Sequence, residues 1–451
     1  DFLGINGASD VQLLSGGRFV LFNDGADDPT GAVGVQNNEG AVILASATSF
    51  GEVGRFYGQT DDNEGLGSVG FVTQRPNGNF FIHSPGAGAN NEGALYLANG
   101  TSGVSNGTFN DLLIGRVDGT APSENFGANL NTFTLTNGDV LVASITSNAG
   151  GAANGGTLVQ VVSDGSLGGG NLVRGRIDGG SASEFLGSQS PFMATDGIHY
   201  ILGSPNADPG GLANAGSLYF VNQNTGAVAS RLDGQSASEQ LGLAGSVFTG
   251  SSGNYFVRAQ FADVGGATDA GRIVVVTPAG TPLGQVAGNA PSEFFGSSLQ
   301  FVDNDLWVFA PGHNAGAGGI FAIANSDLGG GNVLRASLLG STAGDALGSL
   351  GASFVNSSNF LVRVPLADVG GLVDAGSAIM INRSLQVLGR TDGSSANEQY
   401  GTNFQFLSGG NLLFRSPNAD VAGLVDAGVV KLVSGQTGNL IGQTAGTSAN
   451  E

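Results

Sequence analysis

The sequence predicts an all-β fold: a β-propeller of eight four-stranded antiparallel blades that forms a single domain over residues 1–451. Two observations lead to this prediction. A marker of the form acidic, any residue, bulky apolar, glycine recurs along the whole chain about every 55 residues, which is typical of a repeat architecture. Between markers, apolar residues alternate or run on for a few positions and are bounded by Gly, Asn, Asp or Pro, which is typical of strands and turns.

The markers set the phase of the repeat. Their acidic residues stand at positions 1, 64, 124, 184, 239, 293, 345 and 398, and the chain reaches another acidic residue at Glu451. The predicted repeats are therefore approximately 1–63, 64–123, 124–183, 184–238, 239–292, 293–344, 345–397 and 398–451. Alternatives with the same repeats are seven blades plus an extra unit, or part of a longer repeat array.

The last repeat shows the expected meander most clearly. We expect its strands at residues 403–407, 411–415, 429–433 and 439–443. Second strands elsewhere, such as Leu306-Trp307-Val308-Phe309, are apolar with little alternation, which suits a strand covered on both faces. Each sheet must then be sealed by its neighbours, and closure into a ring would remove the two exposed terminal faces.

Composition narrows the classes of partner and compartment. A formal net charge of −21 with 15 basic residues repels phosphate backbones, so we expect no nucleic-acid partner. No apolar run approaches the roughly 20 residues that span a bilayer, so we expect no membrane insertion. The chain has no cysteine and is rich in Gly, Asn, Ser and Thr. This composition favours an extracellular or bacterial cell-surface location.

At the markers the chain resembles the FG-GAP repeats of integrin α-chain propellers and related bacterial propellers. Phe126-Gly127 and Phe295-Gly296 match the first half of the pattern, and Ser204-Pro205 and Ser416-Pro417 are similar to the second half. The repeats are also similar to those of large secreted bacterial exoproteins of the haemagglutinin-like type. The FG-GAP resemblance implies a propeller whose first hairpins bind calcium through several carboxylates. Here turns such as Thr136-Asn137-Gly138-Asp139 hold one or none, and only Asp303-Asn304-Asp305 holds two.

The loop after the second strand offers a different candidate for calcium. It has the form Ala-Asp-Val-Gly-Gly-x-x-Asp-Ala-Gly or close to it, with two carboxylates six residues apart. These carboxylates and glycine-rich backbone carbonyls are the hard oxygen ligands that calcium prefers. The alternative is that each Asp accepts backbone N–H groups of its own turn. The residues concerned are Asp263 and Asp269, Asp368 and Asp374, and Asp420 and Asp426.

Other recurrent polar residues favour structural roles. Arg-x-Asp-Gly, as at 176–179, predicts a β-turn with its glycine at positive φ. We expect the acidic marker residue, for example Glu184, to accept hydrogen bonds from the turn that follows it. Eightfold repetition argues against catalysis because a catalytic group is needed once. His83, His199 and His313 occupy different positions in their repeats, and no catalytic or cofactor motif is visible.

Three functions remain open. The first is a non-enzymatic extracellular adhesion or binding module of a bacterial surface or secreted protein, which binds another extracellular protein or a glycan through rim loops. The second is a structural subunit of an extracellular filament, sheath or surface layer that self-associates. The third is a polysaccharide-acting propeller hydrolase or lyase. We expect no enzyme activity and, calcium apart, no cofactor.

Overall fold

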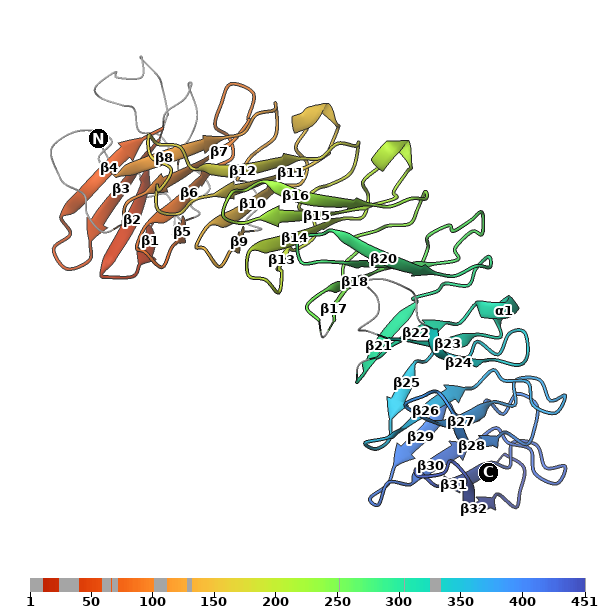
Figure 1. Ribbon diagram of the computed structural model, residues 1–451. Coiled ribbons are helices and arrows are strands. Elements are labelled where there is room, and N and C mark those ends of the chain that lie inside the picture. Colours follow the sequence, from red (N-terminus) through yellow and green to blue (C-terminus); the bar gives the residue numbers. More distant parts are fainter. Residues whose placement is uncertain are drawn as a thin grey trace. The chain divides into compact units, whose positions relative to one another are not determined.

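The computed structural model describes residues 11–23, 40–58, 66, 72–100, 112–127, 132–250, 252–303, 305–324 and 334–450. The chain divides into two compact units, one of residues 1–233 with 242–244 and the other of residues 234–241 with 245–451 (Figure 1). The marker at residues 1–4, most of the marker at 64–67, Asn304 and the glycine-rich insert at 326–332 lie outside the described residues.

The first unit contains four sheets, each with four strands in sequence order. The strands are β1 (Val11–Leu14), β2 (Arg18–Asn23), β3 (Ala41–Ser46), β4 (Glu52–Tyr57); β5 (Val72–Gln74), β6 (Phe80–Ser84), β7 (Ala94–Ala98), β8 (Leu113–Asp118); β9 (Thr132–Thr134), β10 (Val140–Ser144), β11 (Thr157–Val161), β12 (Val173–Asp178); β13 (Phe192–Met193), β14 (His199–Ser204), β15 (Ser217–Asn222) and β16 (Val228–Asp233). Two short 3-10 turns, η2 (Ala149–Gly151) and η3 (Pro209–Gly211), lie between second and third strands.

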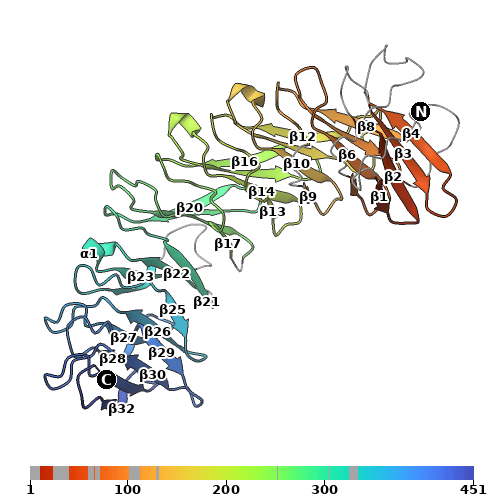
Figure 2. The ribbon, with the colours of Figure 1, turned by 180° about the vertical axis from the view of Figure 1, so that it is seen from behind.

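The second unit repeats this arrangement in four further sheets, which Figure 2 shows from behind. The strands are β17 (Val247–Thr249), β18 (Tyr255–Ala259), β19 (Arg272–Val276), β20 (Pro282–Ala287); β21 (Ser298–Val302), β22 (Asp305–Ala310), β23 (Gly319–Ala324), β24 (Leu334–Leu339); β25 (Ala352–Phe354), β26 (Asn359–Val364), β27 (Ser377–Asn382), β28 (Val387–Asp392); β29 (Asn403–Phe406), β30 (Leu412–Ser416), β31 (Val429–Val433) and β32 (Leu440–Ala445). One short helical turn, α1 (His313–Gly316), follows β22. No helix among the described residues is long and apolar enough to cross a membrane.

Each sheet lies within one predicted repeat, and we call the sheets blades 1 to 8. All neighbouring strands within a blade pair antiparallel, as in β14 with β15 and β15 with β16. The predictions of an all-β fold and of eight four-stranded antiparallel blades are therefore confirmed. Closure of the blades into one ring, and so into one domain, stays a prediction.

Alternating side chains of a second strand pack against two different neighbours. In β6, Phe80 and Ile82 join a buried cluster with Val20 of blade 1. Phe81, which lies between them, joins a second cluster with Val140 of blade 3. Side chains of a strand point alternately to opposite faces, and both faces of blade 2 are covered. This explains why the second strands are apolar without alternation.

Similar apolar clusters join the other neighbouring blades within each unit. In the first unit one cluster spans blades 3 and 4, and in the second unit three clusters span blades 5 and 6, 6 and 7, and 7 and 8. Each blade also carries a register shift between its third and fourth strands, for example between Met380 and Ile381. This irregularity recurs at the same point in the other seven blades. Such bulges increase the local twist of a sheet.

A substitution at the contact between Trp307 and Phe360 tests whether blade 6 packs on blade 7. The two rings lie 4.6 Å apart, and both side chains are buried. We expect Phe360→Ala to lower the free energy of unfolding by about 3–5 kcal/mol, because it leaves a cavity between the blades. The change is measured by urea unfolding, followed through the fluorescence of Trp307, the single tryptophan.

Phe406→Ala is the matched control, because this phenylalanine is 46% exposed. Its expected effect is below about 1 kcal/mol. Equal unfolding midpoints for the two variants would contradict the packing described here.

Candidate functional site

In blade 4, the acidic marker residue is a buried carboxylate whose two oxygens both accept hydrogen bonds. Glu184 is 1% exposed, and one of its oxygens accepts the backbone N–H groups of Gly180 and Ser181 at 2.8 and 3.1 Å. Its other oxygen accepts the hydroxyls of Ser204 and Tyr219 at 3.0 and 3.1 Å. Burial and the nearby Glu184 raise the pKa of Tyr219, so its hydroxyl stays protonated and donates.

The donors come from the turn before the marker, so the expectation that they come from the following turn is wrong. In every described glutamate marker they are the residues four and three positions earlier in the chain. The N–H groups of Phe185 and Leu186, which follow Glu184, already donate to the carbonyls of Asn154 and Gly155 of blade 3. The corresponding donor pairs are Thr120 and Ala121 for Glu124, Gln235 and Ser236 for Glu239, Asn289 and Ala290 for Glu293, and Ser394 and Ser395 for Glu398.

The remaining carboxylate oxygen binds a different partner in different blades. Glu124 contacts Arg176 at 3.1 Å, Glu239 contacts the buried Arg272 at 2.6 Å, and Glu293 contacts Nδ1 of His313 at 2.8 Å. In each case the partner belongs to the blade that follows the marker. Each of these carboxylates therefore fixes the marker to the following blade.

The apolar marker residue binds the preceding blade instead. Leu186 is fully buried, and its N–H donates to the carbonyl of Gly155 at 2.9 Å. Gly156 has φ +81°, and a Cβ there would lie 2.5 Å from the backbone N of Leu186. A glycine is required at this position because only glycine permits such a close approach. The marker thus holds two neighbouring blades together.

The Arg-x-Asp-Gly motif at residues 176–179 lies at the end of a strand. Its interpretation as a β-turn with glycine at positive φ is therefore wrong. Arg176 and Asp178 lie on β12 two residues apart, which places them on one face, and Arg176 Nε contacts Asp178 Oδ1 at 2.9 Å. Gly179 does not have positive φ. It is needed because an added Cβ would lie 2.1 Å from the carbonyl oxygen of Gly155.

The six aspartates proposed as calcium ligands form clamps within their loops. The loops between second and third strands at residues 260–271, 365–376 and 417–428 are called rim loops from here on. In each rim loop, the carboxylate of the first aspartate accepts the backbone N–H of the second at 2.9 Å. The second aspartates have positive φ values of 49° to 52°. The pairs are Asp263 with Asp269, Asp368 with Asp374, and Asp420 with Asp426.

A tight turn forms the tip of each rim loop. Val369 and Leu372 exchange two backbone hydrogen bonds, and both residues between them, Gly370 and Gly371, have positive φ. Positive φ at both central residues is the form of a type I′ turn. Next to this tip, Leu372 and Val373 are exposed to solvent. Calcium binding at the rim loops stays a prediction: in the part of the chain that the structure describes, no three His, Asp or Glu side chains are grouped so as to hold a metal ion.

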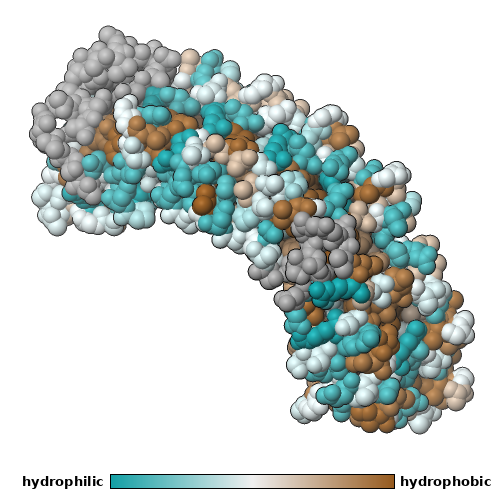
Figure 3. All heavy atoms as spheres, in the orientation of Figure 1, coloured by the Kyte–Doolittle hydropathy of each residue, from teal (hydrophilic) through white to brown (hydrophobic). Residues whose placement is uncertain are grey.

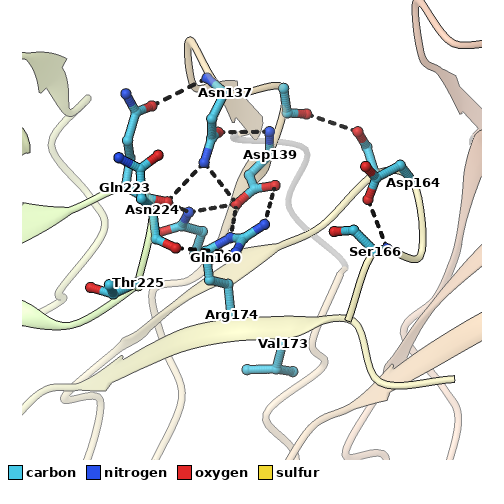
Figure 4. Close-up of polar contacts among 12 residues, drawn as sticks. Asn137, Asp139, Gln160, Asp164, Ser166, Val173, Arg174, Gln223, Asn224 and Thr225 are labelled. Atoms are coloured by element: carbon cyan, nitrogen blue, oxygen red, sulfur yellow. Dashed lines mark hydrogen bonds and ion pairs between the residues drawn. The ribbon is translucent and has the colours of Figure 1, made fainter. Parts of the chain in front are cut away.

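A buried polar cluster lies at the first hairpin turn of blade 3, where the FG-GAP resemblance places calcium. Figure 4 shows the Asp139 carboxylate surrounded by nitrogen donors. It accepts Gln160 Nε2 at 2.6 Å and Arg174 Nε at 2.5 Å. Asn137 donates to the same carboxylate at 3.1 Å and to the carbonyl of Gln223 in blade 4 at 2.8 Å. The single carboxylate of this turn is therefore occupied by protein donors.

The asparagine contact between blades recurs elsewhere and was not anticipated from the sequence. Asn77 of blade 2 donates to the carbonyl of Ser163 in blade 3 at 2.9 Å. Asn359 of blade 7 donates to the carbonyl of Gly435 in blade 8 at 3.1 Å. Asparagine at or next to the first hairpin turn in several repeats is the signal that could have revealed this contact.

The three histidines bind three different partners. His83 Nδ1 lies 2.9 Å from the carbonyl of Gly127, and burial lowers the pKa of its ring. His199 contacts Asp196 at 2.7 Å. His313 contacts the marker residue Glu293. Each histidine therefore has a polar partner of its own.

Comparison with known proteins finds only distant structural similarity. No family model matches the sequence, and no curated protein does. Some solved structures are similar at low identity and low TM-score. BamB from Moraxella catarrhalis is 11% identical with a TM-score of 0.28, over 90% of this chain and 92% of that chain. The dihydro-heme d1 dehydrogenase NirN in complex with DHE is 12% identical with a TM-score of 0.29, over 90% and 71%. The C-terminal WD40 domain of Sif2 is 10% identical with a TM-score of 0.30, over 84% and 87%.

The buried ion pair between Glu239 and Arg272 provides a test of the marker junction. We expect Arg272→Ala to lower the free energy of unfolding by about 3–5 kcal/mol, because it leaves a buried carboxylate without its cation. Thermal and urea unfolding measure the loss. Arg390→Ala is the control, because the Arg390–Asp392 pair is about one third exposed on both sides and such pairs contribute about 0–1 kcal/mol. Equal losses of unfolding free energy for the two variants would show that the pair of Glu239 and Arg272 does not stabilise the junction.

Calcium titration tests the rim loops. Each first carboxylate already accepts a backbone N–H, so we expect millimolar calcium to release no heat in calorimetry and to leave the melting temperature unchanged. Asp368→Ala should lower stability by about 1–2 kcal/mol, because it removes a hydrogen bond that a charged group accepts. This loss should be the same with calcium and with a chelator. Heat of binding that Asp368→Ala abolishes would instead establish a metal site.

Proposed function

We propose that the chain is a non-enzymatic binding module of a bacterial surface or secreted protein, and that it binds an extracellular protein or glycan through its rim loops. A repeated blade fold of this kind suits a binding or scaffolding role. The observation that carries the proposal is the rim loop itself, in which a side-chain clamp and a tight turn hold an exposed apolar tip in a defined conformation.

The hydrogen bonding of the acidic residues supports a role without catalysis. Glu124, Glu184, Glu239 and Glu293 each accept backbone N–H groups with one oxygen and a side-chain donor with the other. A general acid or base needs an oxygen within reach of its substrate. These carboxylates are buried and fully engaged in joining blades.

The surface of the rim loops supports a binding role. Leu372, Val373 and Val425 lie beside the turn tips, and the two valines are each 57% exposed. Figure 3 shows brown apolar residues among teal and white ones on the surface of the second unit. Apolar contacts supply affinity, whereas the surrounding amide, hydroxyl and backbone groups supply directional hydrogen bonds. Because the loops are already ordered, less conformational entropy is lost on binding.

The partner class follows from charge and composition. The chain has a net charge of −21, which disfavours acidic partners. The partner classes that remain are neutral glycans and proteins with neutral or basic surfaces.

Binding of the full chain to a glycan array and to a panel of purified extracellular proteins tests the proposal. We expect at least one ligand to bind without chemical change. The triple variant Leu372→Ser, Val373→Ser, Val425→Ser should weaken that binding at least tenfold in surface plasmon resonance.

Val387→Ser is the matched control, because Val387 is 51% exposed on β28, away from the rim loops. It should leave the affinity unchanged. Release of reducing ends or unsaturated sugars from any glycan would replace this proposal with the hydrolase or lyase. Binding that the triple variant does not alter would exclude the rim loops.

A further inference from the structure

A cavity of about 160 Å³ lies between blades 5 and 6, beside the marker residue Glu293. Its walls are mostly apolar, whereas Glu293 and His313 form a polar side. The apolar walls come from Val286 of β20, the marker residue Phe295, and Phe321, Ile323 and Leu334 of blade 6. Phe295 and Ile323 are buried, but Leu334 is 54% exposed. The cavity therefore has a buried end and can be reached from solvent.

A serine at one position of blade 6 accounts for this space. In blade 3, Arg176 of β12 lies opposite Val159 of β11 and contacts the marker residue Glu124 at 3.1 Å. The corresponding residue of β24 is Ser337, which lies opposite Phe321 of β23. A serine is too short to reach the marker carboxylate as the arginine does. Part of the junction between blades 5 and 6 is therefore left unfilled.

His313 takes over the marker carboxylate in blade 6. One oxygen of Glu293 accepts the backbone N–H groups of Asn289 and Ala290 at 2.9 and 3.2 Å. The other lies 2.8 Å from Nδ1 of His313, and this nitrogen donates because a carboxylate oxygen accepts. Nε2 of the same ring makes no hydrogen bond to any residue that the structure describes. His313 therefore brings one unused hydrogen-bonding atom to the cavity.

Aromatic rings stand next to this histidine. The rings of His313 and Phe321 lie 5.1 Å apart in an edge-to-face arrangement, and those of Phe321 and Phe295 lie 5.5 Å apart. Aromatic side chains favour such contacts with further rings. A cavity of about 150 Å³ lined by Leu, Ile and Phe is large enough to bind benzene. The cavity between blades 5 and 6 therefore has room for one six-membered aromatic ring.

We propose that this cavity binds a small neutral phenol, with its ring against Phe295 and Phe321 and its hydroxyl paired with Nε2 of His313. A phenolic hydroxyl can donate or accept, so it pairs with this nitrogen in either protonation state of the imidazole. Glu293 and the net charge of −21 disfavour an anionic ligand. The phenol is either a free molecule or the tyrosine side chain of another protein. None of the cavity residues belongs to a rim loop, so this site goes beyond the function proposed above.

Titration of the full chain with phenol and with toluene, followed by NMR, tests the proposal. We expect phenol to bind with a dissociation constant of about 1 mM or below, as suits a ligand of this size. His313→Leu keeps a side chain of similar volume but removes the partner of the hydroxyl. It should weaken phenol binding about fivefold more than toluene binding, because one hydrogen bond is lost. A general disturbance of the fold would weaken the two ligands equally.

Leu334→Trp should abolish the binding of both ligands, because it fills the cavity from an exposed position at the start of β24. Leu339→Trp is the matched control, since Leu339 is 51% exposed on the same strand and does not line this cavity. It should bind phenol as the wild type does. Absence of saturable phenol binding, equal weakening of phenol and toluene in His313→Leu, or binding that survives Leu334→Trp would each overturn the proposal.

N-acetyltyrosinamide and 4-methylphenol distinguish the two sources of the phenol. Equal affinity for the two would support a tyrosine side chain as the ligand, whereas binding of 4-methylphenol alone would support a free phenol. The triple variant Leu372→Ser, Val373→Ser, Val425→Ser should bind phenol as the wild type does. Phenol binding and rim-loop binding can therefore fail independently of each other.

Discussion

A carboxylate removed from water must be surrounded by hydrogen-bond donors, and this requirement sets the path of the chain between blades. Glu184 takes two backbone N–H groups from the turn before it and two hydroxyls from the blade after it. Leu186, two residues later, is buried on the blade before it. Loss of any of these donors would leave a buried charge partly unsatisfied, at a cost of several kcal/mol. The apolar clusters between sheets seal the faces, while the marker fixes where each sheet meets the next.

Most of the fold could be predicted from the sequence, because the period of the markers and the apolar runs are both local signals. In the last repeat, the third strand was placed at residues 429–433, where β31 lies, and the other three strands are displaced at their ends by one or two residues. The expected donors to Glu184 and the expected turn at Arg176–Gly179 were wrong for a common reason. Both depend on contacts with Asn154 and Gly155 of blade 3, 24 to 31 residues away in sequence, which no local pattern encodes.

The candidate surfaces were only partly predictable for the same reason. The spacing of Asp263 and Asp269 identified the rim loops, since a six-residue clamp is local, and the aspartates do accept a backbone N–H of their own loop. The cluster around Asp139 joins residues from two blades, so the sequence showed only a turn with one carboxylate.

The variety of side chains that meet the marker carboxylate has a consequence for assembly of a tandem array. The side chain is an arginine in two blades, Arg176 on β12 and Arg272 on β19, whereas Tyr219 and His313 serve the equivalent junctions elsewhere. During synthesis, similar neighbouring repeats tend to dock in the wrong order or to exchange between molecules. A marker docked against a blade other than its own would lose its native side-chain donor and meet one in a different position. Such a non-native pairing is therefore destabilised. Divergence among the repeats therefore favours the pairing of each sheet with its native neighbour.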